Sequence, residues 1–206
     1  IALDQANEKI YFTLGAGVIE MANLDGSQVQ TIVGGLAGHT FIALDIPNNQ
    51  IYWSIESSPG LIQRTDLYGM GIQTLISGDV GKVKYAKFIS LDSISNKLFY
   101  RSNTPGNTDY LIKALHLDGT GNIESVISGQ FNNGVEGIAV DSNGRKIYWA
   151  GRDSNTIYRS NINGPGSETV ITGLSDPMGI ALDLVSQKIY WTDEGSKDIQ
   201  RANLDG

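Results

Sequence analysis

The sequence contains no cysteine and only two histidines, His39 and His116, among its 206 residues. The absence of cysteine excludes disulfides, thiolate metal sites and a cysteine nucleophile. A metal site on either histidine would need two or three further ligands converging on it. The Gly-x-Ser-x-Gly motif of many serine hydrolases is also missing. The sequence therefore predicts a protein that is not an enzyme and that needs no cofactor.

Positive charge and long apolar runs are scarce as well. Lys and Arg number 15 against 22 Asp and Glu, which gives a net charge of −7. A protein that binds nucleic acid through its phosphates, or an anionic membrane surface, would need a basic patch. No apolar run approaches the roughly 18 residues needed to cross a bilayer. Nucleic-acid binding and membrane insertion are therefore not expected.

What the sequence has in abundance is repetition, because a unit of forty-odd residues occurs nearly five times. Each copy opens with an apolar run that ends in Asp: Ile1–Asp4, Ile42–Asp45, Ile89–Asp92, Ile138–Asp141 and Ile180–Asp183. A period of this length made of short strands is typical of a propeller blade or a solenoid coil. One copy cannot bury its own apolar faces, so the copies must stack on one another.

Four strand signals can be identified within each copy. The first strand always has a small residue at its middle position, which suggests crowding at the centre of a propeller: Ala2, Ala43, Ser90, Ala139 and Ala181. The second strand carries a pair of aromatic residues, which favour a pleated surface covered on both faces: Tyr11-Phe12, Tyr52-Trp53, Phe99-Tyr100, Tyr148-Trp149 and Tyr190-Trp191. The third strand ends, in most copies, in an Asp-Gly or Asn-Gly turn, and a more polar fourth strand follows.

These signals predict an all-β fold, a β-propeller of four-stranded antiparallel blades that forms a single domain over residues 1–206. The repeats cover residues 1–41, 42–88, 89–137, 138–179 and 180–206, and the last one lacks its outer strand, so nineteen strands are expected. Five closed blades are favoured, because an open ring would expose an apolar blade face. An incomplete six-bladed propeller and a solenoid are the alternatives.

The motif in the fifth copy resembles a known repeat. Tyr190, Trp191, Thr192 and Asp193 resemble the Tyr-Trp-Thr-Asp propeller repeat of the low-density lipoprotein receptor, related endocytic receptors and nidogen. In that family the Asp is structural and bonds between blades, and the resemblance implies the same for Asp193. It also implies an extracellular or secreted protein. The other copies depart from the motif at the Asp position, which holds Leu14, Ile55, Ser102 and Gly151.

Binding residues are expected in the links between blades and between second and third strands. These links vary in length and chemistry, and variable loops on a rigid scaffold commonly carry binding. The hypothesis is that a protein ligand is bound near the axial mouth by His39, Tyr85, Lys87, Arg101, Glu136 and Arg152. Each of these residues could equally be an ordinary solvated loop residue.

Two further function classes stay open. Five-bladed lectins exist, but they repeat one sugar site per blade, and the polar residues of these links do not repeat. Some propellers are metal-dependent lactonases with Glu, Asn and Asp around a central ion. Glu136, Asp153 and Asn155 could imitate that arrangement, although these residue types are common in any loop.

Overall fold

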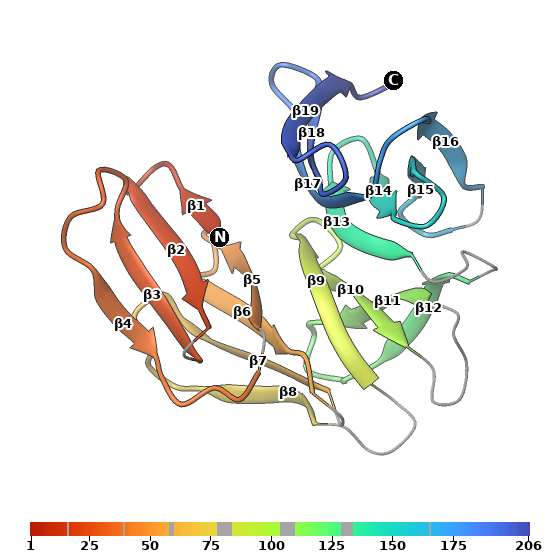
Figure 1. Cartoon of the computed structure of the whole chain (residues 1–206). Coiled ribbons are helices and arrows are strands. Elements are labelled where there is room, and N and C mark those ends of the chain that lie inside the picture. Colours follow the sequence, from red (N-terminus) through yellow and green to blue (C-terminus); the bar gives the residue numbers. More distant parts are fainter. Residues whose placement is uncertain are drawn as a thin grey trace. The chain divides into compact units, whose positions relative to one another are not determined.

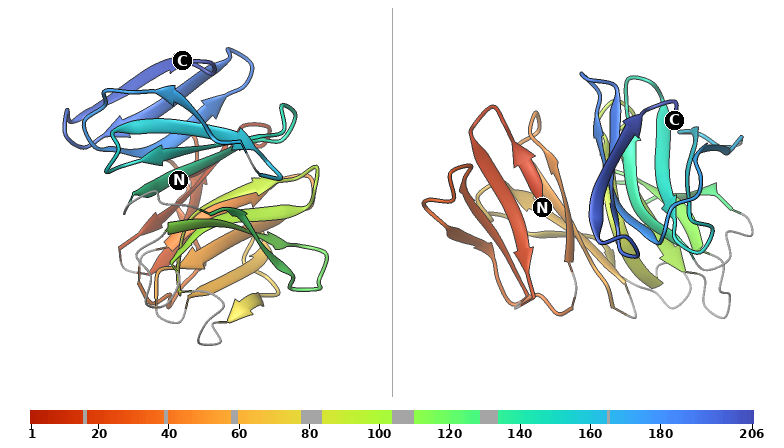
Figure 2. Two further views of the ribbon diagram at one scale, coloured as in Figure 1. Left: turned by 90° about the vertical axis from the view of Figure 1, so that its right-hand side faces the viewer. Right: turned by 45° about the horizontal axis from the view of Figure 1, so that its top comes forward.

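The computed structural model describes residues 1–15, 17–38, 40–57, 60–77, 84–103, 110–128, 134–164 and 166–206. In these residues all regular structure is β-strand, nineteen strands in five antiparallel sheets (Figures 1 and 2). Within the same residues, no helix has the length and apolar character that a bilayer crossing would require. The chain forms two compact units, Ile1–Leu91 and Asp92–Gly206.

Each repeat of the sequence forms one sheet, here called a blade, in which the strands pair in sequence order. Blades 1 and 2 are β1 (Ala2–Asp4), β2 (Lys9–Leu14), β3 (Val18–Asn23) and β4 (Gln30–Val33), then β5 (Thr40–Asp45), β6 (Gln50–Ile55), β7 (Leu61–Asp66) and β8 (Gln73–Ser77). Blade 3 is β9 (Lys84–Asp92), β10 (Lys97–Asn103), β11 (Tyr110–His116) and β12 (Ile123–Ile127).

Blade 4 is β13 (Val135–Asp141), β14 (Lys146–Gly151), β15 (Thr156–Asn161) and β16 (Glu168–Ile171), and blade 5 has three strands, β17 (Pro177–Asp183), β18 (Lys188–Asp193) and β19 (Asp198–Asn203). The predicted fold class is confirmed: the chain is all-β, with five blades of a β-propeller. Antiparallel pairing inside every repeat excludes a solenoid, whose coils would pair with one another. That the five blades form a single domain remains a prediction.

The core of each unit lies between the faces of neighbouring blades. In the first unit Tyr11 and Ile19 of blade 1 pack with Ile51 and Trp53 of blade 2, and all four are at most 2% exposed. In the second unit Tyr148 and Ile157 of blade 4 pack with Ile189 and Trp191 of blade 5. Both aromatic residues of the second strand are buried in blades 2, 3 and 4, whereas Phe12 and Tyr190 are half-buried. Burial on both faces explains why these strands show little polar alternation.

The link between first and second strands is a tight turn with a recurring backbone conformation. The residue that precedes each second strand has a positive φ between 52° and 55°: Glu8, Asn49, Asn96, Arg145 and Gln187. The Asp that ends the first strand stabilises the turn with its carboxylate, as when Asp141 accepts from the backbone N of Gly144 at 2.8 Å. Such short local bonds form an Asx turn, so these links serve the fold.

Several link residues, among them the predicted binding residues Tyr85, Lys87 and Glu136, are strand residues instead. Lys84–Phe88 belongs to β9, Val135 and Glu136 open β13, and Pro177 and Met178 open β17. The loop interpretation was wrong because irregular backbone interrupts these strands without ending them. Tyr85 and Phe88 have φ near +50°, and the β13 and β17 ladders shift register beyond Glu136 and Pro177. These are bulges, which redirect side chains near the end of a strand.

Candidate functional site

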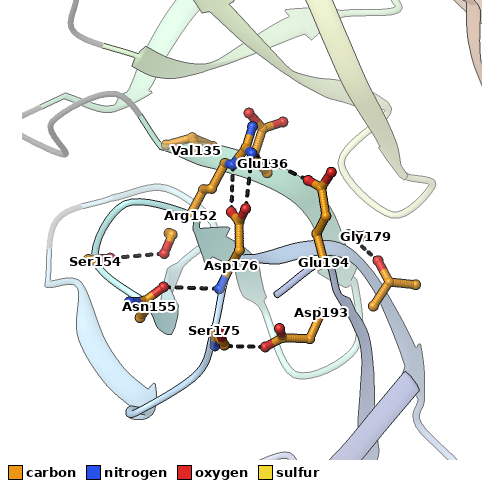
Figure 3. Close-up of polar contacts among 12 residues, drawn as sticks. Val135, Glu136, Arg152, Ser154, Asn155, Ser175, Asp176, Gly179, Asp193 and Glu194 are labelled. Carbon is orange, nitrogen blue, oxygen red and sulfur yellow. Dashed lines mark hydrogen bonds and ion pairs between the residues drawn. The ribbon is translucent and has the colours of Figure 1, made fainter. Parts of the chain in front are cut away.

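A group of polar contacts in the second unit lies where the links of blades 4 and 5 meet (Figure 3). It is formed by the start of β13, the link between β14 and β15, the link between β16 and β17, and the link after β18. Arg152 is at its centre. Its backbone N donates to the carbonyl oxygen of Gly134 at 2.7 Å, which ties two of these segments together.

Arg152 forms a bidentate ion pair with Asp176 through two nitrogens of its guanidinium. Nε donates to Oδ1 of Asp176 at 2.5 Å, and Nη2 donates to Oδ2 at 3.0 Å and to Oε2 of Glu194 at 3.3 Å (Figure 3). A bidentate guanidinium–carboxylate pair fixes direction as well as distance. The hydrogen bond to Asp176 raises the pKa of Arg152 further, so the group stays charged. The Arg152 side chain is 40% exposed and that of Glu194 61%, so both present charge to solvent.

Asp176 is held in an unusual backbone conformation. Its φ is +83°, outside the regions that non-glycine residues commonly adopt. Its backbone N donates to Oδ1 of Asn155 at 3.0 Å, and its carbonyl oxygen accepts from the backbone N of Glu194 at 3.0 Å. Strained residues of this kind persist only where surrounding bonds over-determine them. The carboxylate of Asp176 is therefore preorganised.

Two of the predicted binding residues lie beneath this surface. Arg101 and Glu136 form an ion pair with 2.7 Å between Nη1 and Oε1, and Nη1 also donates to the carbonyl oxygen of Val135 at 2.9 Å. The residues are only 4% and 8% exposed. A buried pair like this specifies how two segments fit together more than it presents charge to a partner. The pair supports β13 from the end of β10.

Asp193 binds the segment that joins blade 4 to blade 5. Its Oδ2 accepts from the backbone N of Ser175 at 2.9 Å (Figure 3), and its Oδ1 accepts from the backbone N of Ser196 at 3.0 Å. Burial acts to raise the pKa of Asp193, but these N–H donors outweigh it and leave the pKa below its usual value. The carboxylate, 2% exposed, is thus bonded within the protein, and the structural role that the resemblance implies stays a prediction.

The other motif residues make contacts within blade 5 and with blade 4. Trp191 is 4% exposed in the core between blades 4 and 5, while Tyr190 lies opposite Arg201 in the β18–β19 ladder. The Thr192 hydroxyl oxygen accepts from the backbone N of Gly179 at 2.9 Å. In the residues that the structure describes, none of the four therefore forms part of an exposed polar cluster.

In the first unit, Tyr85 and Lys87 lie on the irregular part of β9, beside the link that follows β6. The Lys87 ammonium pairs with the Glu56 carboxylate, and the backbone N of Tyr85 donates to the carbonyl oxygen of Ser57 at 3.3 Å. The ring of Phe88 lies 4.6 Å from that of Phe41, centroid to centroid. His39, predicted for the same neighbourhood, lies outside the described residues.

The geometry does not assemble the lactonase-like set. Glu136 is engaged by Arg101, and the amide oxygen of Asn155 accepts from the backbone of Asp176. Over the described ranges, no three His, Cys, Asp or Glu side chains gather closely enough to hold a metal ion.

Sequence reasoning missed Asp176 and Glu194 as site residues. Both fall in links that were expected to bind, but no local signal distinguishes them from other acidic loop residues. Their importance comes from Arg152, which lies 24 and 42 positions away in the chain. One partial signal exists, since Asp176 directly precedes Pro177, and a residue before proline is conformationally restricted.

No protein-family model matches the chain. Among curated proteins it is 29% identical over 120 residues to Protein cueball of Drosophila grimshawi. The match covers 57% of this chain and 18% of the relative, so the matched part spans less than a fifth of that protein's length.

Solved structures match over nearly the whole chain. A chain of a nidogen/laminin complex has a TM-score of 0.79 and 22% identity, with 95% of this chain and 73% of that chain covered. TolB from Acinetobacter baumannii has a TM-score of 0.76 and 14% identity, with 96% of this chain and 51% of that chain covered. Virginiamycin B lyase from Staphylococcus aureus has a TM-score of 0.66 and 18% identity, with 95% of this chain and 66% of that chain covered. At these identities the comparisons establish the fold, and the resemblance inferred from the repeats holds at that level.

Proposed function

We propose that the chain is a non-catalytic module that binds a protein partner through the exposed surface formed by Arg152, Asp176 and Glu194. The observation that carries the proposal is the bidentate Arg152–Asp176 pair, which is exposed yet fixed by backbone bonds from two links. A charged surface that is ordered before binding loses less side-chain entropy when a partner docks. Arginine is also among the residues most enriched at binding hot spots.

The resemblance and the structural neighbours support the same reading. The chain that matches with the highest TM-score of those described above comes from a complex between two proteins, nidogen and laminin. An extracellular or secreted location is part of the proposal, and it rests on the resemblance. The predicted residues Tyr85 and Lys87 would contribute a second contact region from the first unit. Arg101 and Glu136 would support the surface from below.

The test compares capture by three immobilised proteins: the wild-type chain, Arg152→Glu, and the control Lys146→Glu. Lys146 begins β14 and Arg152 follows its end, so the control changes the same charge at the opposite end of one strand. Extracellular fluid from the source is passed over each protein, and bound proteins are quantified by mass spectrometry. We expect at least one protein that the wild type and the control retain and Arg152→Glu loses.

The candidate must then bind as a purified protein with saturable affinity that Arg152→Glu weakens at least tenfold. If all three immobilised proteins captured the same partners in equal amounts, the result would contradict the proposal. A glycan-inhibitable interaction would instead favour the lectin class, and turnover of a lactone by the purified chain would favour the hydrolase class.

A further inference from the structure

The turn between β7 and β8, here called the blade 2 turn (residues 67–72), carries three exposed apolar side chains. Tyr68, Met70 and Ile72 are 70%, 71% and 52% exposed. Large apolar side chains scattered singly over a surface are ordinary, whereas a contiguous group of them marks an interaction site. These three alternate with two glycines in one short turn, so they form such a group.

The equivalent turns of blades 1, 3 and 4 carry mostly polar residues. Counted from the end of the third strand, the positions of Tyr68 and Met70 are occupied by Asp25 and Ser27, by Asp118 and Thr120, and by Asn163 and Pro165. The cores of protein–protein interfaces are enriched in Tyr and Met and depleted in Asp and Ser. Blade 2 therefore departs from the other blades towards the composition of an interface core.

Hydrogen bonds fix the backbone of the blade 2 turn. Oδ1 of Asp66 accepts from the backbone N of Tyr68 at 2.9 Å and from that of Met70 at 2.8 Å. The Thr65 hydroxyl donates to the carbonyl oxygen of Met70 at 2.6 Å. The apolar side chains therefore project from a backbone that is already ordered, which lowers the entropy cost of binding a partner.

The exposure of this turn follows from its place in the blade. The turn packs against the preceding blade, since a Cβ on Gly69 would lie 2.2 Å from the carbonyl oxygen of Ile32 in blade 1. A blade that follows in the same unit leaves the turn open. Blades 1 and 3 are each followed by such a blade, and their residues at the two positions are exposed: Asp25, Ser27, Asp118 and Thr120.

The surroundings of the turn indicate the chemistry of its partner. No charged residue occurs in the sequence from Leu67 to Ile76. A Cβ on Gly71 would meet nothing within 4 Å outside its chain neighbours, so the space over this glycine is open. Met70 and Ile72 flank Gly71 in the chain. A fitting partner is therefore uncharged at this point and offers a side chain that fills the space over Gly71.

We propose that the blade 2 turn binds an uncharged, apolar segment of a partner protein. Tyr68 and Met70 form the centre of the contact, and an aliphatic or aromatic side chain of the segment lies over Gly71. The blade 2 turn belongs to the first unit and the Arg152 surface to the second. The two proposals therefore stand or fall separately.

Two other occupants fit the turn less well. Surfaces that lie on a membrane combine apolar side chains with Lys and Arg, whereas this turn has neither cation and the chain has a net charge of −7. A second copy that met this turn with its own would bury far less than the roughly 800 Å² per partner of a stable interface.

The probe is a library of random peptides displayed on phage and selected on the immobilised wild-type chain. Enriched peptides are synthesised with a fluorescent label and titrated with the chain by fluorescence polarisation. We expect uncharged peptides with aliphatic and aromatic residues, whose affinity the double variant Tyr68→Asp/Met70→Ser weakens about tenfold or more. This variant gives blade 2 the residues that blade 1 has at Asp25 and Ser27, so it should fold.

The matched control, Ile94→Asn, also replaces an exposed apolar residue by its counterpart from another blade. Ile94 is 61% exposed, and Asn143 holds the equivalent position in blade 4. The control should leave peptide binding unchanged. Gly71→Asn should weaken binding, because it fills the space over Gly71 at a φ of +74° that Asn tolerates.

Three results would overturn the proposal. The first is a selection that enriches no peptide, or peptides that bind the double variant as tightly as the wild type. The second is binding to phosphatidylcholine vesicles that the double variant loses, since the occupant would then be a lipid surface. The third is a concentration-dependent dimer in sedimentation that the double variant abolishes, which would make the occupant a second copy.

Discussion

Blades 4 and 5 differ at the residue that ends the second strand, which is Gly151 in one and Asp193 in the other. Asp193 binds the backbone of two links. In blade 4 a side chain would not fit, because a Cβ on Gly151 would lie 2.4 Å from the Ser154 hydroxyl oxygen and 2.6 Å from the Tyr158 ring. There the Ser154 hydroxyl donates to the carbonyl oxygen of Gly151 at 3.1 Å.

The motif carboxylate is therefore one of several groups that can order a link. Hydroxyl-to-backbone bonds replace it in blade 4, where the Tyr158 ring also stacks on Trp149 at 5.6 Å between centroids. The third strands of the two blades differ in another way. Ile157 and Ile199 occupy equivalent positions in their ladders, but Ile157 is buried and Ile199 is exposed. Local links can vary between blades, whereas Ile157 is buried because the fourth strand of its own blade and the face of blade 5 both cover it.

The largest expected effect separates these two isoleucines. Ile157→Ala should lower the free energy of unfolding by about 3 kcal/mol, because it leaves a cavity in a fully buried site. Ile199→Ala should change it by less than about 0.5 kcal/mol, since the side chain is already exposed. Urea unfolding followed by tryptophan fluorescence measures both. Equal losses would mean that β19 is covered in solution.

A second pair of variants compares the equivalent glycines near the start of β13 and β17. A Cβ on Gly137 would lie 2.3 Å from the carbonyl oxygen of Met178 and 2.7 Å from the backbone N of Ile180, both in blade 5. A Cβ on Gly179 would meet only the Thr192 hydroxyl, at 3.3 Å. Gly137→Ala should therefore cost about 2 kcal/mol through overpacking of backbone against backbone.

Gly179→Ala serves as the control and should cost less than about 0.5 kcal/mol, because a side-chain hydroxyl can shift. The same urea titrations apply. A tolerated Gly137→Ala would show that β13 and β17 are further apart than their contact here implies.

Asp193 gives the third prediction, which has a pH signature. Asp193→Asn should cost about 1.5 kcal/mol at pH 7, the scale of hydrogen bonds to a charged group. Because the folded pKa of Asp193 is lowered, its stabilisation is present above the unfolded pKa of about 3.9 and is lost as pH falls through the folded pKa. The stability difference between wild type and variant, measured by urea unfolding, should therefore shrink below about pH 4.

A stability difference between wild type and Asp193→Asn that stays constant from pH 7 to pH 3 would contradict this account. It would mean that the negative charge of Asp193 does not contribute to its bonds with the links. Asp183→Asn is a useful comparison, because Asp183 also accepts backbone N–H bonds but lies in an exposed turn. Its variant should show a smaller loss at neutral pH.

Sequence reasoning predicted the fold closely and the site only in part. Five copies of one pattern repeat the same turn and strand signals, so ambiguities in one copy are resolved by the others. The polar run Gln28–Val33 in the first repeat suggests a longer outer strand than the structure has, since β4 begins at Gln30 and Gln28 has a φ of +55°. A backbone reversal at a single polar residue leaves no periodic trace.

The site depends on contacts that no repeat encodes. Arg152 was expected among the binding residues, but its partner Asp176 comes from the link between blades 4 and 5 and Glu194 from the link after β18. Arg101 was expected among the binding residues near the axial mouth. It is buried because β10 continues to Asn103 and β13 covers its end with Val135 and Glu136. Pairings of this kind follow from the stacking of blades, and a single sequence does not report them.

The smallest expected effect concerns Arg152 itself. Arg152→Lys keeps the charge but removes the guanidinium fork, and Lys cannot bind both oxygens of Asp176 in one plane. Because the pair is substantially exposed, the stability should change by less than about 0.5 kcal/mol. The order of the links should change more, and hydrogen exchange of the backbone N–H groups of Asp176 and Glu194 should become faster.

Arg159→Lys is the matched control, because it removes an arginine fork from the same blade at its pair with Glu168. It should leave the exchange of Asp176 and Glu194 unaltered. If Arg152→Lys also left their exchange unaltered, the bonds from Asn155 and between the two links would suffice to order this surface. Arg152 would then lose its organising role and keep only its charge.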